Sequence, residues 1–326
     1  MEVLQGIGSF APDGGSAVTV GFFDGVHVGH QAVIRQAVKA ATERGIRSVA
    51  LTFDRHPREV LTPNDVPQLL TTLRRKAELI QALGVDVLAV MEFDEDASRW
   101  PPERFMDQVL VNGLGIRHAV VGANFTFGYK AAGTAEVLAE LGRTRGFGVE
   151  SVPLTELDGR AVSSTSIRNA LSEGDLAWPE RALGRRYAVE GTVVPGAGRG
   201  RDLGFPTANL RTPARILLPG RGVYAGRAHA GGDSWAAAIN IGTNPTFGEE
   251  PLHVEAFLLD FEGDLQGTVL SVEFWVRLRD EHRFESPDAL ALQMEEDVAR
   301  TRALVLGSQG GPGGVPRPEA TNHRGG

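Results

Sequence analysis

Short apolar runs alternate with amphipathic stretches through the first half of the chain. Each stretch has about the length of a crossover helix, and nearly every run is apolar on both faces, which predicts a parallel sheet covered by helices on both sides. We therefore expect an α/β fold here. The apolar runs are Ala17–Gly21, Ser48–Phe53, Val85–Met91, His118–Val121 and Val149–Val152, and the amphipathic stretches are Gln31–Arg44, Leu73–Leu83, Glu103–Leu114 and Thr134–Arg145.

The pattern changes near Leu183 to that of antiparallel strands. Turn residues such as AGGD and FEGD separate the β-rich runs, and one helical pattern follows from Pro287 to Leu304. This half is predicted to be a small antiparallel β-barrel with a C-terminal helix. The β-rich runs are Tyr187–Val194, Gly222–Ala230, Ala236–Ile241, His253–Leu259 and Thr268–Val276.

Length and composition limit the remaining choices. A chain of 326 residues exceeds what one core usually supports, so we expect domains at 1–184 and 185–306. Residues 307–326, rich in glycine and proline, are predicted to form a disordered tail. With no cysteine, the chain has no disulfide scaffold and no thiolate nucleophile.

Charge and hydropathy point to an enzyme or binding protein of the cytoplasm. The formal net charge of −8 argues against a broad nucleic-acid surface. No apolar run approaches the roughly 20 residues of a membrane-spanning helix, and no secretory signal is evident. We therefore expect neither a nucleic-acid nor a membrane partner. A homo-oligomer is left open.

The stretch GFFDGVHVGH, residues 21–30, lies between a predicted strand and a predicted helix from Gln31. A glycine-rich turn that enters a helix directs free backbone N–H groups at one point, which favours a phosphate. Gly25 and Gly29 allow close approach of the main chain, and His27 and His30 can donate hydrogen bonds to phosphate oxygens. A single histidine here would more often be a surface turn residue or a helix cap. Two histidines with two glycines favour the phosphate site.

A second polar stretch, SSTSIR at residues 163–168, has four hydroxyl side chains near a helix start, followed by Arg168. Hydroxyls can donate and accept around phosphates, and a guanidinium can bind a phosphate with two hydrogen bonds. Taken alone, the stretch is more often an ordinary helix N-cap.

Four motifs in order resemble bacterial FAD synthetases, which carry a form of the HxGH nucleotidylyltransferase motif. These are GFFDGVHVGH, TFDRHP (52–57), VVGANFTFG (120–128) and SSTSIR. The resemblance implies a Rossmann-like domain that transfers AMP from ATP, with His27 and His30 as catalytic residues. The absence of GxxxxGK[ST] disfavours a P-loop kinase. The implied nucleotide-binding residues are Gly21, Phe22, Asp24, Gly25, Gly29, Ser163, Ser164, Thr165 and Arg168, and the implied flavin-binding residues are Asn124, Phe125 and Phe127.

The second half resembles riboflavin kinases. GRGRDLGFPTANL (198–210) resembles their phosphate-binding signature, and HVEAFLLDF (253–261) resembles their catalytic strand. The resemblance implies that Gly198, Gly200 and Gly204 bind nucleotide, that Thr207 and Asn209 hold Mg²⁺ through hard oxygen ligands, and that Glu255 is the catalytic base. Taken alone, PTAN is an edge strand with polar residues facing solvent, and Glu255 is an exposed strand residue.

Together the two motif sets resemble prokaryotic bifunctional riboflavin kinase/FAD synthetases over roughly residues 15–304. The resemblance implies that riboflavin is phosphorylated to FMN and that FMN is adenylylated to FAD with release of pyrophosphate, with ATP as co-substrate and Mg²⁺ as cofactor. Arg55, Gln266 and Tyr129–Lys130 depart from the family pattern. Two other classes stay open, a nucleotidylyltransferase that acts on another phosphate and a non-catalytic flavin- or nucleotide-binding regulator.

Overall fold

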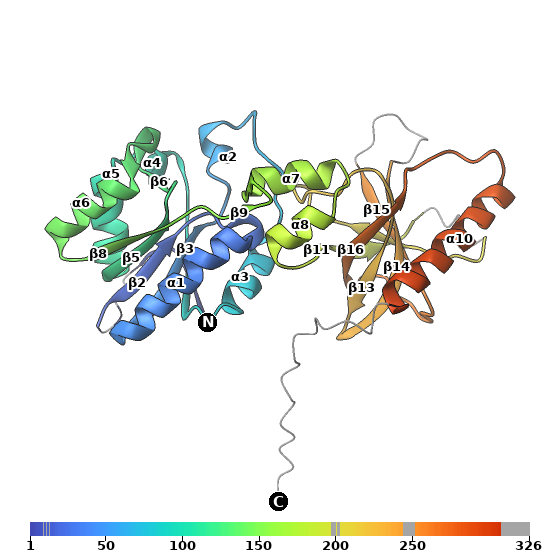
Figure 1. The fold of residues 1–326 in the computed structure, drawn as a ribbon, viewed down its shortest axis with the longest axis horizontal. Coiled ribbons are helices and arrows are strands. Elements are labelled where there is room, and N and C mark those ends of the chain that lie inside the picture. Colours follow the sequence, from blue (N-terminus) through green and yellow to red (C-terminus); the bar gives the residue numbers. More distant parts are fainter. Residues whose placement is uncertain are drawn as a thin grey trace, which may run out of the picture.

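The computed structural model describes residues 1–8, 10, 12, 14–196, 200, 203–243 and 252–307. Its first half is built on a six-stranded parallel sheet with strand order β1-β4-β3-β2-β5-β8 (Figure 1). The predicted strands are all present, and the α/β prediction is confirmed. The strands are β1 (Glu2–Gln5), β2 (Ser16–Val20), β3 (Arg47–Phe53), β4 (Val87–Met91), β5 (Ile116–Gly122) and β8 (Gly148–Val152).

Helices cover both faces of this sheet because its inner strands are apolar on both faces. Ile34 of α1 and Ile80 of α3 pack on one face, while Met106 and Leu138 pack on the other. The helices are α1 (Val28–Arg44), α2 (Arg58–Leu61), α3 (Leu73–Gln81), α4 (Glu95–Ser98), α5 (Pro102–Phe105) and α6 (Ala135–Arg145), with the short turns η1 (Asp24–Val26) and η3 (Tyr129–Ala131) and the π-helix η2 (Met106–Gly113). Four further strands form two-residue pairs, β6 (Thr126–Phe127) with β7 (Gly133–Thr134) and β9 (Glu156–Leu157) with β10 (Arg160–Ala161).

Three local predictions need correction. The helix after the glycine-rich turn begins at Val28, not Gln31, because His27 caps it. The predicted helix Glu103–Leu114 is a short α-helix followed by the π-helix η2, in which the Leu114 N–H donates to the carbonyl of Val109. The edge strand β1 was not expected, because its residues are mostly exposed and form no apolar run.

The second half is a closed barrel with the order β11-β12-β15-β14-β13-β16, in which every pair is antiparallel. The helix α10 (Pro287–Leu306) lies along the barrel beside β14 (Figure 1). This architecture confirms the predicted barrel with its C-terminal helix. The strands are β11 (Tyr187–Val194), β12 (Ala208–Arg211), β13 (Gly222–Ala230), β14 (Asp233–Gly242), β15 (His253–Leu258) and β16 (Val269–Arg279).

Two helices, α7 (Ser164–Ser172) and α8 (Ala177–Leu183), connect the halves. Ile167 and Leu183 from these helices belong to the same buried cluster as Tyr187 and Tyr224 of the barrel. The loop before α3 also reaches the barrel, where Leu69 and Ile216 form a parallel bridge. A single hydrophobic cluster therefore spans the junction between the two halves.

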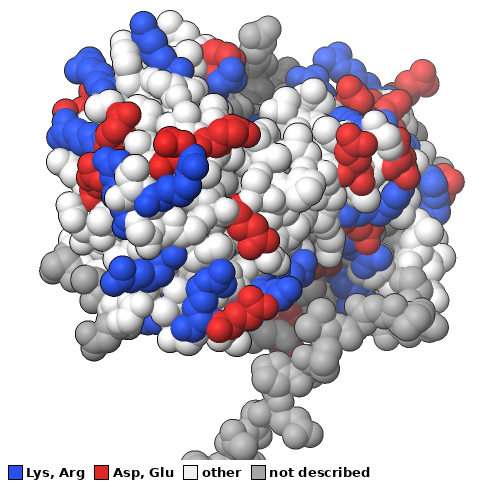
Figure 2. Space-filling model, turned by 60° about the vertical axis from the view of Figure 1, so that its left-hand side comes forward, with Lys and Arg blue, Asp and Glu red and all other residues white. Residues whose placement is uncertain are grey.

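The surface carries charges of both signs. On the face shown in Figure 2, Lys and Arg side chains are interspersed with Asp and Glu side chains, and neither sign dominates the part of that face that the structure describes. Among the described helices, none has both the length and the apolar character that crossing a bilayer requires.

The predicted disordered tail falls almost wholly on residues 308–326, which lie outside the described residues.

Candidate active sites

The glycine-rich turn follows the carboxyl end of β2, the sheet edge at which parallel sheets bind ligands. The Nδ1 of His27 accepts a hydrogen bond from the backbone N–H of His30 at 3.2 Å, so His27 is the N-cap of α1. Since Nδ1 is the acceptor, the proton of the neutral ring lies on Nε2, which is left to donate. The helix-cap interpretation and a donor role are therefore compatible for this residue.

Both histidines of the turn are neutral at physiological pH. Burial lowers the pKa of His27 to about 4, with nearby Asp24 opposing the shift and Arg185 adding to it. Burial also lowers the pKa of His30 well below its usual value, helped by His27 and Lys76. The two rings stack with their centroids 3.6 Å apart. A neutral imidazole offers one N–H donor and one acceptor nitrogen.

Asp24 organises the turn from within. Its buried carboxylate accepts hydrogen bonds from the backbone N–H groups of Leu70 and Thr71 and from Nη2 of Arg168, the last at 2.6 Å. Arg168 also donates through Nε to the carbonyl of Gln68. In this structure the guanidinium of Arg168 therefore holds Asp24 and the loop before α3.

Gly25 lies outside the cavity that this turn lines. Its backbone N–H donates to Oγ1 of Thr71, its φ is +77°, and a Cβ would come within 2.8 Å of the side chain of Leu70. Packing against Leu70 therefore explains the glycine. Gly29 does line the cavity, and a Cβ there would crowd the ring of His27 at 3.2 Å.

The cavity has a volume of about 360 Å³. Most of the residues predicted for nucleotide and flavin line it, namely Gly21, Phe22, Asp24, His27, Gly29, His30, Asn124, Phe125, Ser163, Ser164, Thr165 and Arg168. Phe127 does not line it, because its buried ring packs behind Phe125 with centroids 5.5 Å apart. Ser163 is also the N-cap of α7 and forms a reciprocal capping box with Ser166.

His56 was missed as a site residue, although its motif TFDRHP was noted. It lines the same cavity, and its ring contacts Phe22 edge-on at 4.7 Å. Burial, with the nearby Arg168, lowers its pKa to about 4. Its position three residues after the end of β3, the strand paired with β2, was the signal in the sequence.

The buried neutral histidines make this half sensitive to acid. Above pH 6.5, His27 is neutral in both the folded and the unfolded chain, so its contribution to stability is constant. As pH falls from 6.5 to about 4, the unfolded chain binds a proton that the folded chain excludes, and the free energy of unfolding decreases. One pKa unit is worth about 1.4 kcal/mol, so His27 accounts for a loss on the order of 3 kcal/mol.

Denaturant titrations at pH 7 and pH 4.5 measure this loss in the wild type and in His27→Asn. Asparagine can cap the helix but does not titrate in this range, so we expect a flatter pH dependence in the variant. If the free energy of unfolding changed with pH as steeply in the variant as in the wild type, His27 would not be the source of the acid sensitivity.

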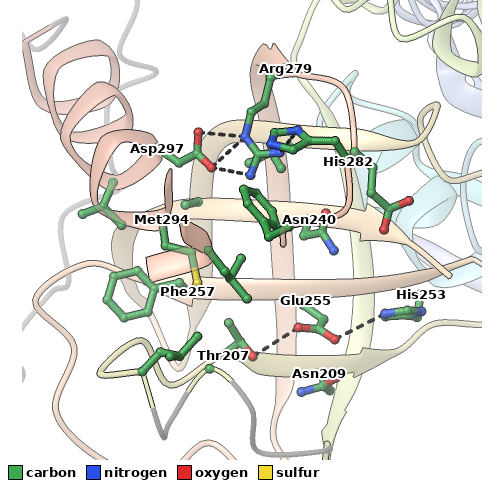
Figure 3. A pocket seen from close by; sticks show the side chains of 18 of the residues that line it. Thr207, Asn209, Asn240, His253, Glu255, Phe257, Arg279, His282, Met294 and Asp297 are labelled. Atoms are coloured by element: carbon green, nitrogen blue, oxygen red, sulfur yellow. Dashed lines mark hydrogen bonds and ion pairs between the residues drawn. The ribbon is translucent and has the colours of Figure 1, made fainter. Parts of the chain in front are cut away.

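In the barrel, three polar residues lie in register on neighbouring strands. Glu255 of β15 is paired with Asn209 of β12 on one side and with Asn240 of β14 on the other. Its neighbours Val254 and Ala256 are fully buried in the core. Alternation therefore directs Glu255, Asn209 and Asn240 to the same face, and Figure 3 shows all three beside one cavity.

Thr207 and His253 contact the carboxylate of Glu255 in this cavity. Oγ1 of Thr207 donates a hydrogen bond to Oε2 of Glu255 at 3.3 Å, and Nε2 of His253 lies 3.3 Å from Oε1 (Figure 3). The cavity has a volume of about 300 Å³, and much of its wall is apolar, including Phe257, Phe284 and Met294. An apolar wall with a few polar side chains on one side is typical of a small-molecule binding site.

An ion pair closes the other side of the cavity. Arg279 of β16 donates to both carboxylate oxygens of Asp297 on α10, with Nη2 to Oδ2 at 2.8 Å (Figure 3). Asp297 is almost fully buried, so the pair attaches α10 to the barrel. Asn240, Arg279 and Asp297 were all missed from the sequence.

The predicted nucleotide glycines of the barrel lie before β12. Gly200 lines the cavity of Glu255, and a Cβ there would meet the carbonyl oxygen of Phe205. Gly204 has a φ of +88° and lines neither this cavity nor its neighbour. Gly198 lies outside the described residues.

A second barrel cavity, of about 260 Å³, lies beside the first. Thr207 and Asn209 line both cavities, while Phe261, Asp264 and Gln266 line only the second. Thr207 and Asn209 are therefore placed between two ligand-sized spaces.

Comparisons with known proteins agree for both halves. A family model described as FAD synthetase matches residues 10–166, and one described as riboflavin kinase matches residues 183–305. The bifunctional riboflavin kinase/FMN adenylyltransferase of Pseudomonas fluorescens is 40% identical over 310 residues, which cover 94% of this chain and 99% of that protein. The protein of the same name from Escherichia coli K12 is 33% identical over 305 residues, 93% of this chain and 97% of that one.

A solved structure shares the whole fold. The crystal structure of a macrolide-efflux protein from Streptococcus pneumoniae is 29% identical and has a TM-score of 0.84, over 93% of this chain and 99% of that chain. Motifs, geometry and relatives agree, and the chain belongs to the bifunctional riboflavin kinase/FMN adenylyltransferase family.

Proposed function

We propose that this chain phosphorylates riboflavin to FMN in the barrel and adenylylates FMN to FAD in the parallel-sheet half, with one ATP consumed at each site. The observation that carries this proposal is the arrangement of the cavities. The cavity around His27 and the cavity around Glu255 have no lining residue in common, and each is lined by residues of one motif set.

In the kinase reaction, Glu255 acts as general base. The flavin ring occupies the apolar cavity, and its terminal hydroxyl lies beside Glu255. The carboxylate takes the hydroxyl proton as the oxygen forms a bond to the γ-phosphorus of ATP, and the bond from that phosphorus to the bridging oxygen breaks, so that ADP leaves. The second barrel cavity, on the other side of Thr207 and Asn209, holds the nucleotide.

The donor set between the barrel cavities fits Mg²⁺. Thr207, Asn209 and Glu255 provide hydroxyl, amide and carboxylate oxygens, which are the ligands that Mg²⁺ prefers, and the ion usually takes its remaining ligands from substrate phosphates and water. We propose that Thr207 and Asn209 hold the metal. When bound, it neutralises charge on the transferred phosphoryl group.

In the adenylyl transfer, the phosphate of FMN attacks the α-phosphorus of ATP and pyrophosphate leaves. The nucleophile is already an anion, so the site needs orientation and charge stabilisation and no general base. His27 and His30 donate to the phosphates, and Ser163, Ser164 and Thr165 close the opposite side of the cavity. Asn124 and Phe125 hold the FMN. Gly21, Phe22 and Gly29 form the floor under the nucleotide.

Three predicted binding residues act through the shape of the site. Asp24 and Gly25 fix the turn against Leu70 and Thr71, and Phe127 supports the ring of Phe125. Arg168 holds Asp24 through Nη2, and Nη1 is the nitrogen we assign to a phosphate. We place the domain boundary between Gly184, which ends α8, and Arg185.

A time course tests the function. We expect purified protein with riboflavin, excess ATP and Mg²⁺ to produce FMN first and FAD afterwards, when the flavins are separated by chromatography. Added chelator should stop FMN formation. FMN without FAD would contradict the adenylyltransferase site, and bound but unconverted riboflavin would support a non-catalytic regulator.

A further inference from the structure

A partly buried arginine contacts the backbone of the glycine-rich turn and does not line the cavity. Arg185, between α8 and β11, donates through Nη2 to the carbonyl of Gly25 at 2.7 Å and through Nη1 to the carbonyls of Leu183 at 3.2 Å and Val26 at 3.5 Å. No carboxylate of the described residues lies within salt-bridge distance of it. Burial, with the nearby Arg75, lowers the pKa of its guanidinium to about 10, so the group stays charged at neutral pH.

Two of the three carbonyls that Arg185 holds, those of Gly25 and Val26, belong to the residues just before His27. In a trans peptide, the C=O and the following N–H point in opposite directions, so fixing the carbonyl of Val26 directs the N–H of His27 away from Arg185. Gln31 of α1 donates to the carbonyls of Val26 and Leu183 as well, at 2.9 and 2.8 Å. The turn is therefore held between α1 and the junction that leads into the barrel.

The turn has a second connection to the barrel through Asp24. The N–H groups of Leu70 and Thr71 hold the Asp24 carboxylate. The preceding residue, Leu69, donates its N–H to the carbonyl of Arg215 at 2.6 Å and accepts from the N–H of Leu217 at 2.9 Å. Both supports of the turn are thus anchored at the barrel.

We propose that Arg185 is a positioning residue for adenylyl transfer, which fixes the backbone of the turn that presents His27 and adds a positive charge behind the phosphates. This inference rests on the proposed adenylyl transfer in the parallel-sheet half. The barrel thereby supports the chemistry of the other half, in addition to carrying its own.

The test compares Arg185→Met, Arg185→Lys and the matched control Arg186→Met in the full-length chain. Arg186 is also partly buried, but it stacks on Trp275 and pairs with Glu180, away from the turn. In Arg185→Met we expect the kcat for FAD formation from FMN to fall about 30- to 100-fold, the range expected for a misplacement of roughly 1 Å. We expect the KM values for ATP and FMN to stay within about threefold, and riboflavin phosphorylation to be unchanged. Lysine keeps the charge but not the planar fork, so Arg185→Lys should recover only a small part of the rate.

Three outcomes would overturn the proposal. The first is an adenylylation kcat within about threefold of wild type in Arg185→Met, and the second is an equal loss of both activities. The third is full recovery in Arg185→Lys, which would show that charge alone suffices and that the turn does not depend on the planar guanidinium. If Arg185→Met does not fold, Arg185→Gln, which keeps an amide donor without the charge, is measured against the same limits. A wild-type chain that makes no FAD would refute the proposed function itself, and this is seen before any variant is compared.

Discussion

Replacing Glu255 by glutamine is expected to lower the kcat of riboflavin phosphorylation by about 10³-fold, within the range typical of a lost general base. Glutamine has nearly the same shape, and its amide oxygen can still accept the hydrogen bond from Thr207. It cannot take up the hydroxyl proton. Adenylylation of added FMN should stay within about twofold of wild type, since Glu255 does not line the cavity around His27.

Glu273→Gln provides the matched control for this substitution. Glu273 is a half-buried barrel glutamate on β16 that faces His229 at 3.5 Å, much as Glu255 faces His253, but it lines neither barrel cavity. Separate assays of FMN formation and of FAD formation compare the two variants. Less than a tenfold loss in Glu255→Gln, or an equal loss in Glu273→Gln, would remove Glu255 from the role of base.

The second large effect is expected in the other half. His30→Ala should reduce FAD formation from FMN by about 10²-fold, the usual cost of losing one donor that stabilises transition-state charge. The ring of His30 stacks on His27 and meets Phe23 edge-on, so its loss also leaves the His27 ring without support on that side. FMN formation should be nearly unaffected, because the barrel cavities contain no residue of this turn.

His118→Ala is the control for a buried histidine in the same sheet. His118 lies near the start of β5, where its Nε2 is 3.6 Å from Oε2 of Glu150. It does not line the cavity. We expect that variant to lose stability without a selective loss of adenylylation. Equal reductions of FMN and FAD formation in His30→Ala would refute its assignment to adenylyl transfer.

The strands of the parallel sheet could be predicted because burial on both faces produces runs that are apolar without alternation. β2 is buried along its whole length and shows the pattern clearly. β1 has the same pairing but lies at the edge, and its sequence EVLQ is largely exposed and carries no such run. Edge strands depend on backbone pairing with a neighbour that is distant in the chain, in this case β4, and local sequence does not report that pairing.

Site residues that lie within one contiguous motif could be predicted from the sequence. Site residues that come together only through the pairing of distant strands could not. Asn240 is a polar residue within the apolar run of β14, which was the available signal, but its place beside Glu255 follows from the pairing of β14 with β15. Arg279 and Asp297 meet only because α10 returns along the barrel. Gly25 was wrongly expected to contact a phosphate. The sequence cannot distinguish a glycine that is required for packing on Leu70 from one that is required for close approach to a phosphate.

The two activities belong to one chain whose halves share a buried hydrophobic cluster. Leu70, Ile167 and Leu183 from the first half are buried in the same cluster as barrel residues such as Tyr187 and Ile216, so separating the halves would expose this cluster to water. Every copy of the chain thus supplies the two enzymes in a fixed one-to-one ratio.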